Sequence, residues 1–250
     1  MRIFLAGNIA LDVPTDFIKF KAPFVLQTFW DLHKTDGELT KQVLQSSRMF
    51  FLDSGAFTFM NSGKKVDWWE YAKKYAKFIN DFDIKYYFNL DLDTIIGIQE
   101  TQKLTDFLES ETGKKSIPVF HKCQGVKHWR EICEEYDYVA IGASGLTAEC
   151  KWVKNDKLLN QMIRIAHQSG AEVHGLGYTR LSNINDTTVD FDSVDSTSCL
   201  SGGRFGTVYK FTGNKLITKQ CKGRLKDYKS VNSHNVEEWV KMANYKKVNV

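Results

Sequence analysis

The feature that most restricts how this chain can fold is the regular return of short apolar runs, separated by polar segments with helical spacing. A strand–helix alternation of this kind is typical of a parallel sheet covered by helices. Eight runs favour a closed (β/α)8 barrel over an open doubly wound sheet, so we expect an α/β fold of the TIM-barrel type. The predicted strands are Ile3–Gly7, Met49–Asp53, Tyr86–Leu92, Ile117–His121, Tyr138–Ala143, Glu172–Gly177, Phe191–Asp195 and Thr207–Phe211.

The segments between the runs support this interpretation in most places. The stretch VDWWEYAKKYAKFIND (66–81) and residues 155–168 each place apolar side chains on one helical face. Two regions fit the alternation less well. Region 9–48 predicts one helix and is otherwise irregular, and the link 178–190 has little apolar periodicity.

Size and composition fit one domain. The chain has 250 residues, a usual length for an α/β barrel, of which 42% are hydrophobic and 26% charged. We therefore expect a single domain over 1–250 that ends in a basic segment, about 207–250. The net charge of +4 is compatible with a polyanionic partner. Basic residues of this segment include Lys210, Lys215, Lys219, Lys222, Arg224, Lys226 and Lys229.

Cysteine spacing and hydropathy argue against a structural zinc site and against a membrane-spanning helix. The five cysteines are scattered without a CxxC or CxC pair, so the sequence predicts no zinc subdomain. The odd cysteine count and the lack of a signal-peptide pattern favour a cytoplasmic location. Because no apolar run approaches the ~20 residues that a membrane-spanning helix needs, no membrane association is expected.

Polar residues gather where the predicted strands end. The carboxyl ends of barrel strands open on one rim, and active sites lie at that rim. Taken singly, an Asp after a strand is more often a helix N-cap, and a single His is more often a core residue. Several acids at one mouth would repel each other, however, which indicates a functional site. The residues concerned are Asp53, Ser54, Gly55, Asn89, Asp91, Asp93, His121, Gln124, Gly125, Gly142, Ser144, His174, Gly175, Asp192 and Asp195.

Two kinds of chemistry suit such a mouth. One acid can act as a nucleophile and another as a general acid or base, as when an aspartate attacks the anomeric carbon of a sugar. The amide of Gln124 and the turn 142–145 could then recognise the edge of a purine. The competing interpretation is a metal bound by Asp53, Asp91 and Asp93. We predict no metal, because DLD alone is a weak metal signal.

Six motifs, taken in order, resemble those of one known family. They are LDSGAFT (52–58), NLDLD (89–93), FHKCQGV (120–126), YVAIGASG (138–145), VHGLGYT (173–179) and FDSVDSTSCLSGGRFG (191–206). Each alone is weak, but together they resemble the tRNA-guanine transglycosylase superfamily. The resemblance is closest to its small phage and bacterial branch, the deazapurine DNA-modification transglycosylases, and it covers roughly residues 50–206.

The resemblance implies a TIM barrel and a base exchange at an N-glycosidic bond. A nucleophilic Asp would attack C1′ of guanosine or deoxyguanosine, guanine would leave, and a deazaguanine base would displace the enzyme. The enzyme would be a pentosyltransferase that needs no cofactor. Its partners would be DNA and a free guanine or deazaguanine base, while a partner protein or a homodimer stays open.

Two departures from the family favour DNA over tRNA as the substrate. The tRNA enzymes carry a CxCxxC and histidine zinc site after the nucleophile strand, whereas only Cys199, Cys221 and His234 follow that strand here. This chain is also much shorter. The open alternatives are a DNA glycosylase that excises a base with water, a tRNA-guanine transglycosylase, a metal-dependent barrel hydrolase and a non-enzymatic nucleic-acid-binding barrel.

The resemblance also implies roles for single residues. Asp53 would be a base contact and proton carrier, and Asp91 would bind the heterocycle. Gln124 and Gly125 would recognise it, and the exocyclic oxygen would meet Gly142 and Ser144. The rest of the expected base pocket is Ser54, Gly55, Asp93, His121, His174 and Gly175. Contacts to the nucleic-acid backbone are expected from Arg180, Arg204, Lys210, Lys222 and Arg224.

The nucleophile has two candidates, because FDSVDSTS can be aligned in two ways. One alignment selects Asp192 and the other Asp195. The two residues have opposite strand parity, so in a regular strand only one can face the barrel interior. We favour Asp195, since Ser193 and Thr197 share its face and make that face polar.

Overall fold

Eight parallel strands form a closed barrel in a computed structural model, which describes residues 1–7, 13–35, 37–56, 66–142, 149–178, 180–200, 205–222 and 226–248. Neighbouring strands follow the order β4-β3-β2-β1-β8-β7-β6-β5. The bridge between Phe88 and Ile117 joins the two ends of this sheet, with the Ile117 N–H donating to the Tyr87 carbonyl over 2.8 Å. The strands are β1 (Arg2–Ala6), β2 (Phe24–Thr28), β3 (Met49–Asp53), β4 (Tyr86–Tyr87), β5 (Val119–Phe120), β6 (Tyr138–Gly142), β7 (Glu172–Leu176) and β8 (Ser193–Ser196).

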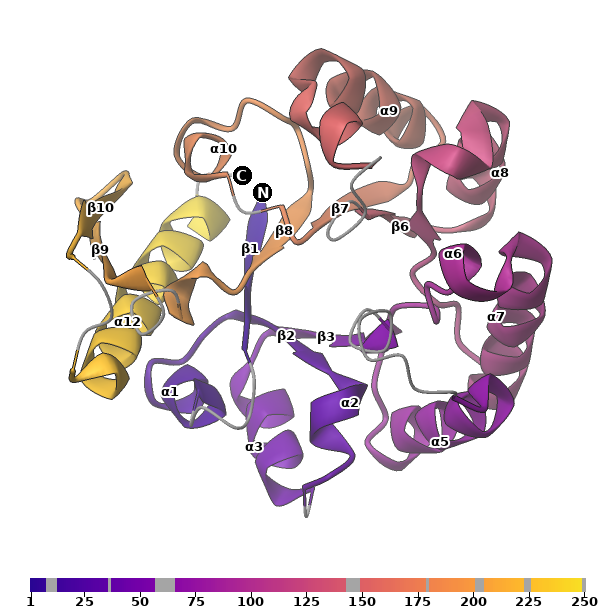
Figure 1. Cartoon of the computed structure of the whole chain (residues 1–250), viewed down its shortest axis with the longest axis horizontal. Coiled ribbons are helices and arrows are strands. Elements are labelled where there is room, and N and C mark those ends of the chain that lie inside the picture. Colours follow the sequence, from indigo (N-terminus) through magenta and orange to yellow (C-terminus); the bar gives the residue numbers. More distant parts are fainter. Residues whose placement is uncertain are drawn as a thin grey trace.

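Helices surround the ring of strands, as Figure 1 shows. The predicted TIM-type (β/α)8 fold is therefore confirmed. The α-helices are α1 (Val13–Lys19), α2 (Phe29–Leu32), α3 (Glu38–Ser46), α5 (Trp68–Asp81), α6 (Asp93–Ile96), α7 (Ile98–Thr112), α8 (Gly125–Glu135), α9 (Asp156–Gln168), α10 (Leu181–Asp186) and α12 (Tyr228–Val248). Short 3-10 helices are η2 (Lys122–Gln124), η3 (Glu149–Lys154) and η4 (Ser198–Leu200).

The two helices that the sequence predicted most clearly are present as α5 and α9, and each begins at a capping side chain. The Asp67 carboxylate accepts a hydrogen bond from the Glu70 N–H over 3.0 Å, and the Asn155 side chain accepts one from the Leu158 N–H over 3.1 Å. Such caps satisfy N–H groups that have no partner inside the helix. The starts of both helices are thus encoded locally.

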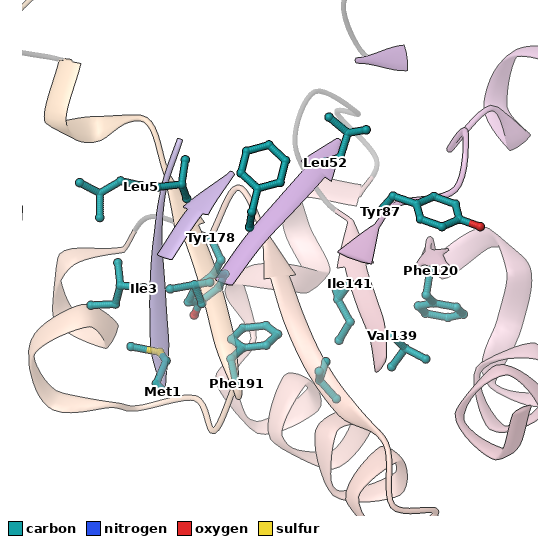
Figure 2. Close-up of a cluster of buried hydrophobic side chains, with 14 of the residues drawn as sticks. Met1, Ile3, Leu5, Leu52, Tyr87, Phe120, Val139, Ile141, Tyr178 and Phe191 are labelled. Carbon is teal, nitrogen blue, oxygen red and sulfur yellow. The ribbon is translucent and has the colours of Figure 1, made fainter. Parts of the chain in front are cut away.

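Strand parity separates the core into two layers. Inside the barrel lie mainly aromatic and small side chains, where the Phe4 and Phe51 rings stack with centroids 4.0 Å apart. The residues of opposite parity pack between the strands and the helices, including Ile3, Leu52 and Ile141, which Figure 2 shows among others. Polar side chains with inward parity therefore point into the barrel rather than toward the helices.

The predicted number of barrel strands is correct, but one member of the set was wrong. Thr207–Phe211 is β9, which pairs antiparallel with β10 (Leu216–Gln220) in a hairpin outside the barrel. The missing barrel strand is β2, inside the region expected to hold only one helix. Its apolar run, Phe24–Leu26, is short and is followed by the polar Gln27 and Thr28, so the strand does not stand out in the sequence pattern.

The C-terminal segment covers part of the outside of the barrel. Helix α12 packs against β1 and against the β9 strand of the hairpin. Lys210 and Lys222 are exposed on this hairpin region, as expected for a basic surface. Among the described residues, we find no helix that combines the length and the apolar character needed to span a membrane.

Candidate active site

Three carboxylates from different strands meet at the mouth of the barrel. Asp53 is the last residue of β3, Asp91 follows β4, and Asp195 lies near the end of β8. Burial, together with the charges on Asp91 and Asp195, raises the pKa of Asp53 to about 7, although the backbone N–H groups of Gly55 and Ser54 act in the opposite sense. An acid with a pKa near neutrality can both donate and accept a proton at physiological pH.

Asp195 has the inward parity of β8 and is only 6% exposed. Its Oδ1 accepts a hydrogen bond from the Gly177 N–H over 2.5 Å and lies 3.2 Å from His174 Nε2. Its neighbour Val194 faces the helix layer instead. The side chain of Asp195 therefore faces the barrel interior, and its role as nucleophile stays a prediction.

Asp192 lies at the opposite end of the barrel, so its predicted place at the mouth was wrong. Its Oδ2 accepts a hydrogen bond from the Val173 N–H over 2.7 Å and lies 2.8 Å from His167 Nε2. Together with Arg2 it lines a basal cavity of about 620 Å³ at the amino ends of the strands. Three residues of a strand span about 10 Å, which separates the two acids along the barrel axis as well as by parity.

Asp91 and His121 form a close pair. Their Oδ1 and Nε2 atoms lie 2.6 Å apart, and Asp91 has a φ of +37°, a conformation that non-glycine residues rarely adopt. A Cβ atom on Gly142 would lie 2.6 Å from Val119 Cγ1 and 2.9 Å from His121 Cε1. The glycine therefore makes the room in which the His121 ring rests against β6.

Asp93 lies close to this pair, at the start of α6. Burial raises its pKa, and the charge of Asp91 adds to the effect. Its buried Oδ2 has no hydrogen-bond partner among the described residues. Asp93 also lines a cavity of about 370 Å³ whose walls come largely from α7 and α8, and Gln124 and His128 line the same space.

Two predicted recognition residues are engaged in local structure. The Gln124 side-chain oxygen accepts a hydrogen bond from the His121 N–H over 2.8 Å, and Gly125 begins α8 with a φ of +82°. Gln124 therefore holds the loop that carries His121. A direct contact from its side chain to a base would use its amide N–H groups.

Hydrogen bonds and a tight glycine turn fix the loop after β3. The Tyr71 hydroxyl donates to the Ser54 carbonyl over 2.6 Å, and the Ser54 hydroxyl accepts from the Ala56 N–H over 3.3 Å. Gly55 has a φ of +76°, and a Cβ there would lie 2.7 Å from Trp30 Cβ. This close turn lets the N–H groups of Ser54 and Gly55 reach the Asp53 carboxylate.

His174 and Gly175 face opposite layers. The His174 ring is fully buried inside the barrel, where its centroid lies 5.3 to 5.8 Å from those of Phe4, Phe51 and Phe88. The Cβ position of Gly175 faces the Phe191 ring in the outer layer, 3.0 Å away. The sequence placed both at the mouth, but Gly175 serves the packing of the outer layer.

The residues predicted to contact the nucleic-acid backbone differ in whether their charge is already paired within the protein. The Arg180 guanidinium pairs with Asp156 and lies over the Tyr178 ring, 4.8 Å from its centroid, so it is already engaged within the protein. Lys210 and Lys222 are exposed. Three predicted site residues, Ser144, Arg204 and Arg224, lie outside the described residues.

One group of side chains in the described part of the chain could hold a metal ion. The ligand atoms of Asp91, Asp93 and His121 lie within 4.8 Å of one another. Carboxylate and imidazole ligands suit divalent first-row metals. This group differs from the set that the sequence suggested, since His121 replaces Asp53.

Motif-based reasoning missed a set of polar residues behind the mouth. Ser193, Tyr138 and Arg2 connect through hydrogen bonds to His174. Tyr138 shares inward parity with Ala140 and Gly142, so strand parity was the one signal that could have pointed to it.

One comparison with a solved structure, at a TM-score of 0.58, supports the barrel fold. No protein-family profile and no protein of curated function matches the chain. A candidate fructose-1,6-biphosphate aldolase from Coccidioides immitis has a TM-score of 0.58 at 11% identity, over 97% of this chain and 89% of that one. The 3-hexulose-6-phosphate synthase of Salmonella typhimurium has a TM-score of 0.49 at 12% identity, over 95% and 98%. Likeness at this identity concerns the barrel and leaves the activity open.

Proposed function

We propose that this protein is an enzyme that exchanges guanine in DNA for a 7-deazaguanine base at the N-glycosidic bond. The observation that best supports the proposal is that two acids at the barrel mouth have different surroundings. Asp53 has a pKa raised to about 7, whereas Asp195 accepts a backbone hydrogen bond beside a buried histidine. Environments that separate the roles of two carboxylates are typical of an acid–base group paired with a nucleophile.

In the first step, an Asp195 oxygen attacks C1′ of the target deoxyguanosine. Oδ1 accepts the hydrogen bond of Gly177, and no described residue bonds to Oδ2, so Oδ2 is the attacking atom. The bond between C1′ and the guanine nitrogen breaks as the C1′–Oδ2 bond forms. Protonated Asp53 gives its proton to a ring nitrogen of the leaving guanine, which makes it a better leaving group.

In the second step, the incoming base restores the free enzyme. Ionised Asp53 takes a ring proton from the 7-deazaguanine, whose nitrogen attacks C1′ and breaks the bond to Asp195. If water attacked instead, the same residues would excise the base and leave an abasic site. Either enzyme must take its target base out of the stacked duplex. The exposed Lys210 and Lys222 support a polyanionic substrate.

A base-exchange assay tests the proposal directly. Duplex and single-stranded DNA are incubated with radiolabelled guanine, and label retained in the DNA is measured for wild type, Asp195→Asn and Asp192→Asn. We expect incorporation by wild type, at least a ~10³-fold loss in Asp195→Asn, and little change in Asp192→Asn, which alters the same strand at the opposite end. Equal loss in both variants would contradict the assigned nucleophile.

Controls in the same assay separate exchange from excision. Abasic sites and free guanine formed without added base would identify a glycosylase. No label in either DNA, together with no abasic sites, would count against both activities. Labelled tRNA formed in preference to labelled DNA would assign the exchange to RNA.

The cluster of Asp91, Asp93 and His121 supports a second candidate, a metal-dependent barrel hydrolase. In such an enzyme the metal would lower the pKa of a bound water and so supply the nucleophile. This candidate predicts that a chelator abolishes activity and that added divalent metal restores it. Base exchange through Asp195 would be insensitive to the chelator.

A further inference from the structure

A continuous hydrogen-bonded chain runs from Asp195 through the barrel interior to the base of the barrel. His174 Nε2 lies 3.2 Å from Asp195 Oδ1, and His174 Nδ1 lies 2.6 Å from the Ser193 hydroxyl. That hydroxyl lies 2.6 Å from the hydroxyl of Tyr138, which in turn accepts a hydrogen bond from Arg2 over 3.2 Å. His174, Ser193 and Tyr138 are all buried.

Arg2 sets the direction of every bond in this chain. A guanidinium has only donors, so the Tyr138 oxygen must accept from it. Tyr138 then has one hydrogen to give, and the Ser193 oxygen is the acceptor described for it. Ser193 in turn gives its single hydrogen to His174 Nδ1. With Nδ1 accepting, the His174 hydrogen is on Nε2, from which it donates to Asp195.

We propose that Arg2 is a positioning residue: acting through Tyr138 and Ser193, it holds His174 as the neutral Nε2–H tautomer that donates to Asp195. This role rests on the proposed function in so far as Asp195 is the nucleophile. A doubly protonated His174 would donate to Ser193, which already accepts from Tyr138, and the Ser193 hydrogen would lose its acceptor in a buried place. The order of the chain therefore opposes the imidazolium form.

Two further observations agree with this order. Burial raises the pKa of Tyr138, although Arg2 opposes the shift, so its hydroxyl keeps the hydrogen that the chain requires. The interior around His174 is otherwise apolar, since Phe4, Phe51 and Phe88 surround the ring. Asp195 thus receives a hydrogen bond that fixes its orientation, without a full positive charge beside it that would weaken it as a nucleophile.

The test is ¹⁵N NMR of the histidine side chains in the free, full-length protein, with His174 assigned through His174→Gln. In wild type at neutral pH we expect a hydrogen on Nε2 of His174 and a bare Nδ1. Tyr138→Phe and Arg2→Met should each change this pattern toward mixed tautomers or toward the imidazolium. Arg2→Lys keeps a side chain that donates hydrogen bonds and accepts none, so it should show the wild-type hydrogen pattern on His174. Glu172→Gln is the matched control, because it removes the charge that pairs with Arg2 over 2.5 Å but keeps an oxygen that accepts from the same Arg2 nitrogen, and the pattern should not change.

A hydrogen on Nδ1 in wild type, or an unchanged pattern in both Tyr138→Phe and Arg2→Met, would overturn the proposal. The activity arm uses the base-exchange assay: kcat should fall about tenfold in Tyr138→Phe and Arg2→Met with KM unchanged, and recover in Arg2→Lys. A fall in both kcat and KM in Glu172→Gln would count against the positioning role of Arg2. If wild type exchanges no base, the proposed function fails, while the tautomer measurement still decides the role of Arg2.

Discussion

The carboxyl group of Asp53 is placed where its ionisation costs the folded protein free energy. Its pKa is raised from 3.8 to about 7 by burial and by the charges of Asp91 and Asp195. Between these two values the unfolded chain has released the proton and the native protein has not. Stability therefore falls as pH rises from about 4 to about 7, and the loss approaches ~4 kcal/mol above that window.

Asp53→Asn should remove this dependence. We expect the variant to gain stability relative to wild type as pH rises, with the gain small near about pH 4 and reaching a few kcal/mol near about pH 8. Urea unfolding of both proteins across this range measures the difference. If the difference between variant and wild type is the same at both ends of the range, Asp53 does not titrate as described.

Gly142 is the residue on which the position of His121 depends. Because a Cβ there would approach Val119 Cγ1 to 2.6 Å, Gly142→Ala should displace its neighbours and lower the free energy of unfolding by about 1–3 kcal/mol. It should also reduce activity by disturbing the Asp91–His121 pair. Gly170→Ala is the control, since Gly170 has a φ of +86° but open space around its Cβ position. Gly170→Ala should lower the free energy of unfolding by about 1 kcal/mol and leave activity unchanged.

At the scale of elements, one side chain joins the β9–β10 hairpin to α12. Asn235 of α12 is fully buried; its Oδ1 accepts from the Tyr209 N–H over 2.8 Å and its Nδ2 donates to the Thr207 carbonyl over 2.9 Å. Asn235→Ala should cost about 3 kcal/mol, because it leaves buried groups of β9 without partners.

Thermal or urea unfolding checks this prediction against a residue of the same type on the same helix. Asn244 is exposed, and among the described residues its side chain donates to the Val240 carbonyl of its own helix. Asn244→Ala should change the free energy of unfolding by less than about 0.5 kcal/mol. Similar losses in the two variants would show that the hairpin is not anchored through Asn235.

At the scale of the whole molecule, the two ends of the hairpin strand β10 carry lysines with different charge partners. Lys215 pairs with Asp186 of α10 near the hairpin turn, whereas Lys222 follows the other end of β10 and is exposed. If DNA binds over the mouth, Lys222→Ala should weaken binding and lower the slope of log K against log salt by about one.

Fluorescence anisotropy with labelled DNA, from about 50 to about 200 mM salt, measures this slope. Lys215→Ala serves as the comparison, because Lys215 is also exposed but its charge is paired with Asp186 of the same chain, and the slope should stay close to that of wild type. An equal change in both variants would mean that the hairpin contributes only general positive charge.

Much of the barrel follows from short-range patterns in the chain. The period of apolar residues predicted α5 and α9, and local caps mark where both begin. The carboxyl ends of parallel strands share one rim, so the placement of Asp53 and Asp91 at a common mouth followed once the barrel was inferred. These features depend on neighbours within a few residues, which is why the linear order of side chains determines them.

Other features depend on residues far apart in the chain, so only the folded molecule decides them. β2 was hidden because its apolar run, Phe24–Leu26, is short, and β9 was misplaced because a strand pattern does not say which sheet receives it. The fold places Asp195 at the mouth and Asp192 at the opposite end of the barrel. The chain from Asp195 to Arg2 joins β8, β7, β6 and β1, and only closure of the barrel brings those strands together.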